Sequence, residues 1–174
     1  MADVLPFSEI TYLFKEFEHT AWRLETRREY ASDRNGDNWK RWQAGERLGF
    51  DPRHPWHANV RAQVEAGKRF QRVRIVDDPP TEGQRFLLAT ARSNITAGED
   101  IRVLPRAEAE RLGLPDFDFW LFDSRILARF HFSDDGTTLG VELTEEPSDV
   151  LRACQVRDVA WHRGFPADDL AWLM

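Results

Sequence analysis

The segment from residue 69 to residue 105 restricts the fold more than any other part of the sequence. Its first part, RFQRVRIVDDPP, alternates apolar and polar residues and predicts a strand that Pro79 ends. Residues 81–97 predict a helix that closes near Gly98, and residues 101–105 predict a second strand. Because a helix that joins two strands of one sheet makes a right-handed crossover, these two strands should be parallel neighbours.

The N-terminal part predicts further helices and a strand. Ser8 can cap a helix whose apolar residues recur at three- and four-residue intervals. These residues are Ile10, Leu13, Phe14, Phe17 and Ala21. The segment 22–30 alternates and predicts a strand, with continuation of the helix as the alternative. An Asn-Gly turn then precedes a short helix that carries Trp39 and Trp42.

The C-terminal part predicts three consecutive strands and a covering helix. The apolar runs DFWLF and SRILARFHF are followed by a turn at Asp135-Gly136 and a last strand, which together form a meander. A helix begins near Pro147. Helices and strands that alternate and are followed by hairpins predict an α/β (α+β mixed) fold, with a mixed sheet of about five to seven strands flanked by helices. We expect residues 1–174 to form one layered domain.

The composition limits the class of partner. With 41% hydrophobic and 31% charged residues, the chain has enough apolar material for its own core. A net charge of -6 makes direct nucleic-acid binding an unfavoured function. The lone Cys154 can form neither an internal disulfide nor a cysteine cluster for zinc. We find no signal-peptide pattern and no apolar run of membrane-spanning length, so we expect a cytoplasmic protein with no membrane association.

The stretch DFDFWLFD places three carboxylates around a strongly apolar run. Asp116 and Asp118 lie two residues apart and would project from one face of a strand, a geometry that can hold Mg²⁺ or Mn²⁺. Asp123 has the opposite parity and cannot join them on a regular strand. The alternative, which we prefer, makes Asp116 and Asp118 a solvated entry to a buried strand and Asp123 the cap of its exit turn.

Two other sets of charged residues are candidate binding sites. Asp77 and Asp78 follow a strand, where α/β proteins place their binding crevice; the alternative is a turn before a helix that Thr81 or Asp78 caps. Arg72, Arg74 and Arg102 alternate with apolar residues on two neighbouring strands and could bind an anion. The alternative is a solvated sheet face whose arginines pair with acidic neighbours. These neighbours are Glu25, Glu99 and Asp100.

Other residue types give no case for catalysis. None of the five histidines is accompanied by further residues at the spacing of a known metal-binding motif. There is also no G-x-S-x-G motif or Gly-rich phosphate loop. We therefore predict no catalytic residues, no cofactor and no resident metal. Residues 161–174 are rich in apolar side chains, which would be covered by the domain itself or by a partner, with a homodimer as one candidate.

The segments LETRREY, RVRIVDDP, NITAGEDIRVLPR and DFWLFDSRILARFHF resemble an uncharacterised actinobacterial family of small proteins. The resemblance covers nearly the whole chain and implies a genomic context beside helix-turn-helix regulators. The order of strands and helices is also similar to one lobe of phospholipase D-like proteins. That similarity implies a His-x-Lys-x-x-x-x-Asp motif, but this chain has Asp116, Asp118 and Asp123 at those positions.

The two resemblances support two hypotheses of different classes. The catalytic histidine attacks phosphorus and the lysine stabilises phosphoryl charge, and a carboxylate can do neither. We therefore favour a non-catalytic binding or regulatory accessory protein that acts with a helix-turn-helix regulator. The alternative is a metal-dependent phosphodiesterase or nuclease that uses Asp116, Asp118 and Asp123, together with Asp77 or Asp78.

Overall fold

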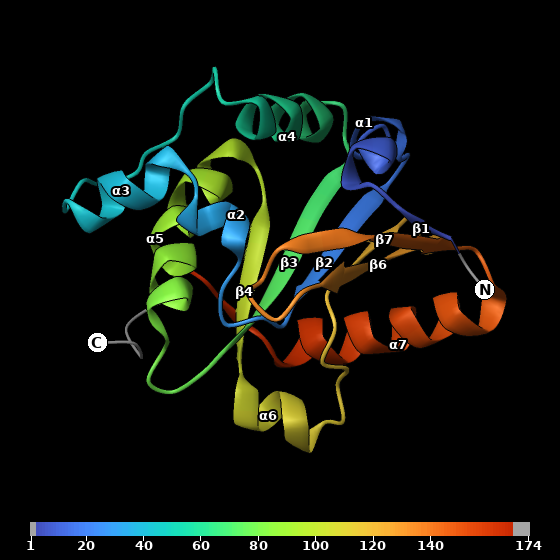
Figure 1. The fold of residues 1–174 in the computed structure, drawn as a ribbon. Coiled ribbons are helices and arrows are strands. Elements are labelled where there is room, and N and C mark those ends of the chain that lie inside the picture. Colours follow the sequence, from blue (N-terminus) through green and yellow to red (C-terminus); the bar gives the residue numbers. More distant parts are fainter. Residues whose placement is uncertain (1–2, 169–174) are drawn as a thin grey trace.

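The computed structural model describes residues 3–168, which fold into a mixed sheet with helices on both faces (Figure 1). Within these residues the sheet has eight strands in the order β1-β7-β6-β5-β2-β3-β4-β8. The strands are β1 (Val4–Leu5), β2 (Thr20–Glu25), β3 (Arg69–Val76), β4 (Asp100–Pro105), β5 (Phe119–Phe122), β6 (Ile126–Phe132), β7 (Thr138–Thr144) and β8 (Phe165–Pro166). The predicted mixed α/β fold is confirmed, and the strand count exceeds the expected range because two-residue strands, β1 and β8, lie at the two edges.

Helices cover the sheet on both sides. They are the 3-10 helix η1 (Phe7–Ile10) and the α-helices α1 (Leu13–Glu16), α2 (Ala31–Arg34), α3 (Asp37–Gln43), α4 (Pro55–Glu65), α5 (Glu82–Ala97), α6 (Arg106–Arg111) and α7 (Pro147–Arg163). Helices α4 and α5 lie on one face with α1, whereas α6 and α7 lie on the other (Figure 1). No helix within residues 3–168 is long and apolar enough to cross a membrane.

The predicted strand–helix–strand unit is present. Strands β2, β3 and β4 are parallel neighbours, and α5 connects β3 to β4. A capping box begins α5, because Thr81 Oγ1 accepts from the backbone N–H of Gln84 and the side chain of Gln84 accepts from the backbone N–H of Thr81. Gly98, with a φ of 128°, follows the last turn in a conformation that favours glycine.

The predicted meander is also present. Strands β5, β6 and β7 pair in antiparallel order, and β5 pairs with β2 on its other side. Asp123 and Ser124 join β5 to β6 with φ angles of 54° and 53°, the left-handed backbone of a tight hairpin turn. The meander therefore extends the parallel unit into one continuous sheet.

The helix predicted from Ser8 to Ala21 is wrong in extent, although its apolar residues are buried. The chain forms η1 and α1, becomes extended at Phe17 and enters β2 at Thr20. The carboxylate of Asp123 accepts hydrogen bonds from the backbone N–H groups of Glu18, His19 and Thr20 at 2.7–3.0 Å. These bonds hold an extended backbone where the sequence pattern alone would continue a helix.

Alternation along the strands divides the side chains between two faces. Ala21 and Phe70 pack with α1 and α4, whereas Trp22 and Val73 pack with α7. Arg23, which has the parity of Ala21, therefore lies on the same face as the first group. This face carries the candidate site, so we call it the inner face.

Candidate functional site

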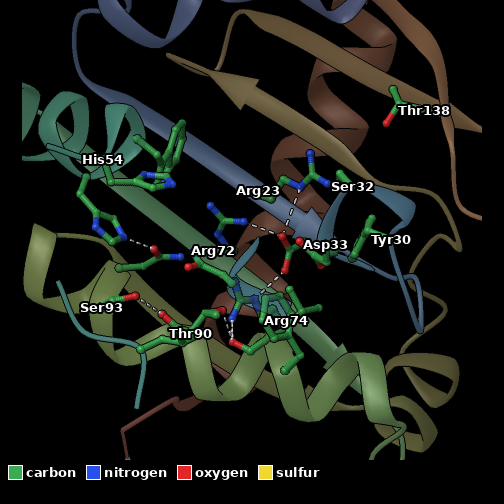
Figure 2. Close-up of a pocket in the computed structure, with 18 of the residues that line it drawn as sticks. Arg23, Tyr30, Ser32, Asp33, His54, Arg72, Arg74, Thr90, Ser93 and Thr138 are labelled. Atoms are coloured by element: carbon green, nitrogen blue, oxygen red, sulfur yellow. Dashed lines mark hydrogen bonds and ion pairs between the residues drawn. The ribbon is translucent and has the colours of Figure 1, made fainter. Parts of the chain in front are cut away.

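A cavity of about 470 Å³ lies against the inner face of the sheet (Figure 2). Strands β2, β3, β5 and β6 form its floor, and α2, α3, α4 and α5 contribute its walls. Its volume is within the range of small-molecule binding sites, which is about 300–1,000 Å³.

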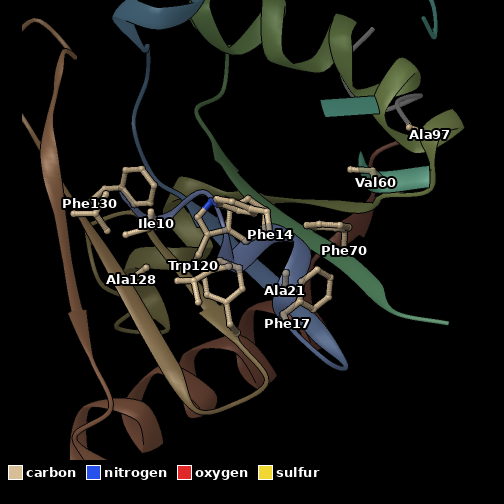
Figure 3. Close-up of a cluster of buried hydrophobic side chains, with 13 residues drawn as sticks. Ile10, Phe14, Phe17, Ala21, Val60, Phe70, Ala97, Trp120, Ala128 and Phe130 are labelled. Carbon is tan, nitrogen blue, oxygen red and sulfur yellow. The ribbon is translucent and has the colours of Figure 1, made fainter. Parts of the chain in front are cut away.

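Aromatic rings form much of the cavity surface. The ring of Phe14 packs edge-to-face against Trp56 at 5.5 Å and against Trp120 at 5.0 Å, and Phe130 belongs to the same buried cluster (Figure 3). The aromatic residues that line the cavity are Phe7, Phe14, Tyr30, Trp56, Phe86, Trp120, Phe130 and Phe132. Because the rings hold one another in place, the cavity has a preformed apolar wall.

A carboxylate at the centre of the floor joins three arginines. Glu25 Oε1 accepts from Arg72 Nη1 at 2.5 Å, and Glu25 Oε2 accepts from Arg74 Nε at 2.6 Å. Arg23 Nε lies 3.8 Å from Glu25 Oε1. Burial would raise the pKa of Glu25, but Arg74, Arg72 and Arg23 outweigh it and lower the pKa to about 2. Glu25 is therefore ionised over the whole physiological range.

A second carboxylate, Glu99, fixes the other side of Arg72. Glu99 Oε1 accepts from Arg72 Nε and Nη2 at 3.1 and 2.9 Å, and Glu99 Oε2 accepts from Trp56 Nε1 at 2.9 Å. The guanidinium of Arg72 lies 5.4 Å from the ring centroid of Trp120. The predicted pairing of Arg72 and Arg74 with Glu25 and Glu99 is thus confirmed, but these groups are not on a solvated face.

The third carboxylate, Asp118, lies just before β5 and is wrongly predicted as solvated. Its side chain has no exposed surface. Asp118 Oδ2 accepts from Tyr30 Oη at 2.6 Å and Arg23 Nη2 at 2.9 Å, and Oδ1 accepts from the backbone N and Oγ1 of Thr26, both at 2.8 Å. Asp116, two residues earlier, is exposed as expected. The groups that bury Asp118 come from β2 and the segment after it, which no local pattern could reveal.

These groups form one ionic network that is balanced in charge. It consists of Arg23, Arg72, Arg74, Glu25, Glu99 and Asp118. Arg74 also donates to the backbone oxygen of Leu87 on α5, which ties the network to the wall of the cavity. Buried charges are tolerated because each has a partner of opposite sign.

Asp33 on α2 adds a further carboxylate at the cavity, which sequence patterns did not single out. Burial and the negative charge of Glu25 raise the pKa of Asp33 to about 6, although Arg74, Arg72 and Arg23 oppose this shift. Tyr30, next to α2, is buried beside Asp118 and Glu25, and its pKa lies well above the ordinary value. Tyr30 therefore stays a hydrogen-bond donor to Asp118.

Two histidines also line the cavity, which their sequence context did not indicate. His57 Nδ1 accepts from the backbone N–H of Asp51 at 3.2 Å, and His57 Nε2 lies 3.0 Å from Asn94 Oδ1. Both ring nitrogens of His57 are thus occupied by the protein. His54 packs on His57 with ring centroids 4.7 Å apart, and burial together with His57 lowers its pKa. His54 is therefore neutral near pH 7.

The predicted acidic pair Asp77 and Asp78 lies outside the cavity lining. Asp77 accepts from Arg28 Nη2 at 3.0 Å, Arg106 Nε at 2.9 Å and Gln84 Nε2 at 2.7 Å. Asp78 is exposed. Asp77 therefore joins β3, α5 and α6, as in the structural alternative, and Thr81 is the helix cap.

The prediction that Arg74 and Arg102 share one anion is wrong. β3 and β4 are parallel as expected, but Arg74 lies opposite Val103, and Arg102 lies opposite Val73. Paired positions share a face, so Arg102 points away from the inner face. Its guanidinium lies 4.0 Å from the ring centroid of Trp161 on α7 and donates to the backbone oxygen of Trp161 at 2.5 Å.

The remaining candidates do not form a shared site. Asp123 holds the backbone before β2 and does not line the cavity. Asp116 and Asp118 are separated by burial, and within residues 3–168 no group of three or more His, Cys, Asp or Glu side chains has a metal-binding arrangement. The predicted apolar docking segment 161–174 lies in part outside the described residues; of its described part, Phe165 is 52% exposed.

Comparisons with known proteins agree on the fold. The family model described as Domain of unknown function (DUF6879) matches residues 8–171. Nuc, a phospholipase D family member from Salmonella typhimurium, is similar in structure, with a TM-score of 0.53, 12% identity and coverage of 91% of this chain and 88% of that chain. NucT from Helicobacter pylori has a TM-score of 0.52, 10% identity and coverage of 95% and 97%. A comparison with curated proteins found no match. The predicted resemblance to a phospholipase D-like lobe is therefore confirmed at the level of fold.

Proposed function

The chain belongs to the DUF6879 family, a domain of unknown function, and from its cavity we propose that it is a non-catalytic protein that binds a small organic ligand. The cavity has the volume, the aromatic wall and the few convergent polar groups that such sites share. Its charged floor is held by internal pairs, which keeps the shape of the cavity fixed before a ligand arrives.

One observation carries the non-catalytic part of the proposal. Asp118 stands where the phospholipase D resemblance implies the catalytic lysine. Its carboxylate accepts four hydrogen bonds from Arg23, Thr26 and Tyr30. A carboxylate with both oxygens occupied in this way serves to position its neighbours. Binding a catalytic cation would require breaking these bonds, so the metal-dependent phosphodiesterase is the less favoured function.

We extend the proposal to a regulatory role. The resemblance to a family encoded beside helix-turn-helix regulators favours a regulator of that class as the protein partner, with a homodimer as the alternative, both in the cytoplasm. In this scheme, ligand binding in the cavity changes the affinity for the partner by a coupling free energy, typically about 1–3 kcal/mol.

The binding part is tested by filling the cavity. Thr90 on α5 lines the cavity, whereas Thr96 on the same helix is exposed and does not. A panel of small organic molecules should raise the melting temperature of the wild type and of Thr96→Trp, but not that of Thr90→Trp. Compounds that stabilise all three proteins equally would place the binding outside the cavity and contradict the proposal.

The non-catalytic part is tested with bis(p-nitrophenyl) phosphate and with Mg²⁺ or Mn²⁺ in calorimetry. We expect no hydrolysis above background and no heat that depends on Asp118. Metal-dependent hydrolysis that disappears in a folded Asp118→Asn variant would instead establish the phosphodiesterase.

A further inference from the structure

Arg23 has unused hydrogen-bonding capacity at the floor of the cavity. A guanidinium carries several N–H donors, yet within residues 3–168 the guanidinium of Arg23 forms one hydrogen bond, from Nη2 to Asp118 Oδ2. Its Nε is buried without a hydrogen-bond partner, and its side chain is 8% exposed. A buried donor that lacks an acceptor is unfavourable, so this position gains from an acceptor that the chain does not supply.

The neighbouring carboxylates do not provide that acceptor. Both oxygens of Glu25 are bonded to Arg72 and Arg74 at 2.5 and 2.6 Å, which leaves Arg23 Nε at 3.8 Å. The oxygens of Asp118 are shared with Thr26 and Tyr30. Of the three arginines in the network, Arg23 therefore has the fewest hydrogen bonds to acceptors in the protein.

The surroundings of Arg23 are aromatic. Its guanidinium lies 4.4 Å from the ring centroid of Phe130 and 5.7 Å from that of Trp120, and both rings line the cavity. Trp56 and Phe132 line it as well. A ligand that reaches Arg23 thus passes between ring faces and edges, which favour a flat, apolar molecular body.

We propose that the cavity binds an aromatic monocarboxylate, with its carboxylate on Arg23 and its ring between the aromatic walls. This inference rests on the proposed ligand-binding function. A carboxylate matches the planar donors of arginine. A single negative charge fits better than two, because the network already balances three arginines with three carboxylates and has no further buried cation to offset a dianion.

Charged groups around the cavity set the conditions for binding. Asp33 and Asp51 oppose an anion when ionised, whereas Arg41 at the rim favours it, and His54 contributes no charge near pH 7. Burial and Glu25 raise the pKa of Asp33 to about 6, so Asp33 is ionised at pH 7.5. Neutralising Asp33 should therefore strengthen the binding of a carboxylate.

The experiment compares 1-naphthoate with its neutral analogue 1-naphthamide by calorimetry. We expect naphthoate to bind the wild type at least about tenfold more tightly than naphthamide, and Arg23→Met to reduce that ratio to within about twofold. Equal affinities for the two probes, or a naphthoate preference that survives in Arg23→Met, would overturn the inference.

A second variant keeps the inference testable if Arg23→Met does not fold. Asp33→Asn should increase the affinity for naphthoate at pH 7.5 and leave naphthamide unchanged; no increase would count against the carboxylate. If naphthamide binds and naphthoate does not, the ligand class is wrong but the binding function stands. If neither probe binds, but other compounds stabilise the wild type and not Thr90→Trp, an aromatic carboxylate is not the ligand and binding in the cavity still stands. If no compound shows that effect, the binding function itself fails.

Discussion

Replacing Glu25 with glutamine should destabilise the protein by an amount that depends on pH. The lowering of the pKa from 4.5 to about 2 means that the folded protein stabilises the ionised form. Each pKa unit corresponds to about 1.4 kcal/mol, so the ionised carboxylate contributes on the order of 3 kcal/mol above pH 4.5. Glutamine keeps the shape of the side chain but leaves Arg74 without its negative partner and Arg72 with Glu99 alone, and breaking a buried pair typically costs about 3–5 kcal/mol.

The sign of the pH effect follows from which state binds the proton. Because the pKa of Glu25 is lower in the folded protein, the unfolded chain takes up the proton first as the pH falls below 4.5. The contribution of Glu25 is thus fully present near neutral pH and is lost as the pH falls toward about 2. The difference between wild type and Glu25→Gln should shrink by up to about 1.4 kcal/mol per pH unit in that window.

The assay is urea denaturation followed by far-UV circular dichroism at pH 7, 5, 4 and 3.5. Glu46→Gln is the matched control, since Glu46 Oε2 pairs with Arg41 Nε at 2.8 Å but both side chains are about half exposed. The control should change the free energy of unfolding by less than about 1 kcal/mol. A Glu25→Gln effect no larger than the control, or one that stays constant down to pH 3.5, would refute the reasoning.

Three other substitutions probe the site and its support. Asp33→Asn should raise the urea midpoint at pH 7 and flatten its pH dependence. The reason is that the folded-state pKa of about 6 makes the wild type lose stability as the pH rises from about 4 to about 6. An unchanged pH profile would contradict this. Tyr30→Phe removes the donor to Asp118 and should cost about 1–2 kcal/mol in the same assay, whereas Tyr12→Phe, at an exposed position, should be neutral. Asp123→Ala removes three bonds to backbone N–H groups and should cost about 2–4 kcal/mol, more than Ser124→Ala on the same turn; equal effects would show that the bonds do not support β2.

Local patterns predicted the parts of the fold that local physics determines. The run 81–97 contains its own cap and stop signals, so α5 appears at the expected boundaries. The crossover rule made β3 and β4 parallel neighbours, and the two turns of the meander were visible as short polar breaks. The start of β2 was missed because its backbone is held by Asp123, a residue more than a hundred positions away.

The site was harder to predict than the fold. Alternation placed Arg72 and Arg74 together and away from Val73, but it cannot say which face of a sheet will be covered. Here α4 and α5 cover the face that carries the charges, so a pattern typical of a solvated face is buried. The same alternation, read together with the parallel register, separates Arg102 from Arg74, and that register depends on where β4 begins relative to β3.

The balanced network on the inner face also constrains how the sequence can change over generations. Removing the charge at any one of its six positions leaves the buried network with one unbalanced charge, so acceptable changes should arrive as compensated pairs, such as Arg74 together with Glu25. Relatives are therefore expected to keep the set intact or to exchange opposite charges jointly for apolar residues. An engineer who wishes to give the cavity a new ligand faces the same rule, and would do better to redesign its aromatic wall than its floor.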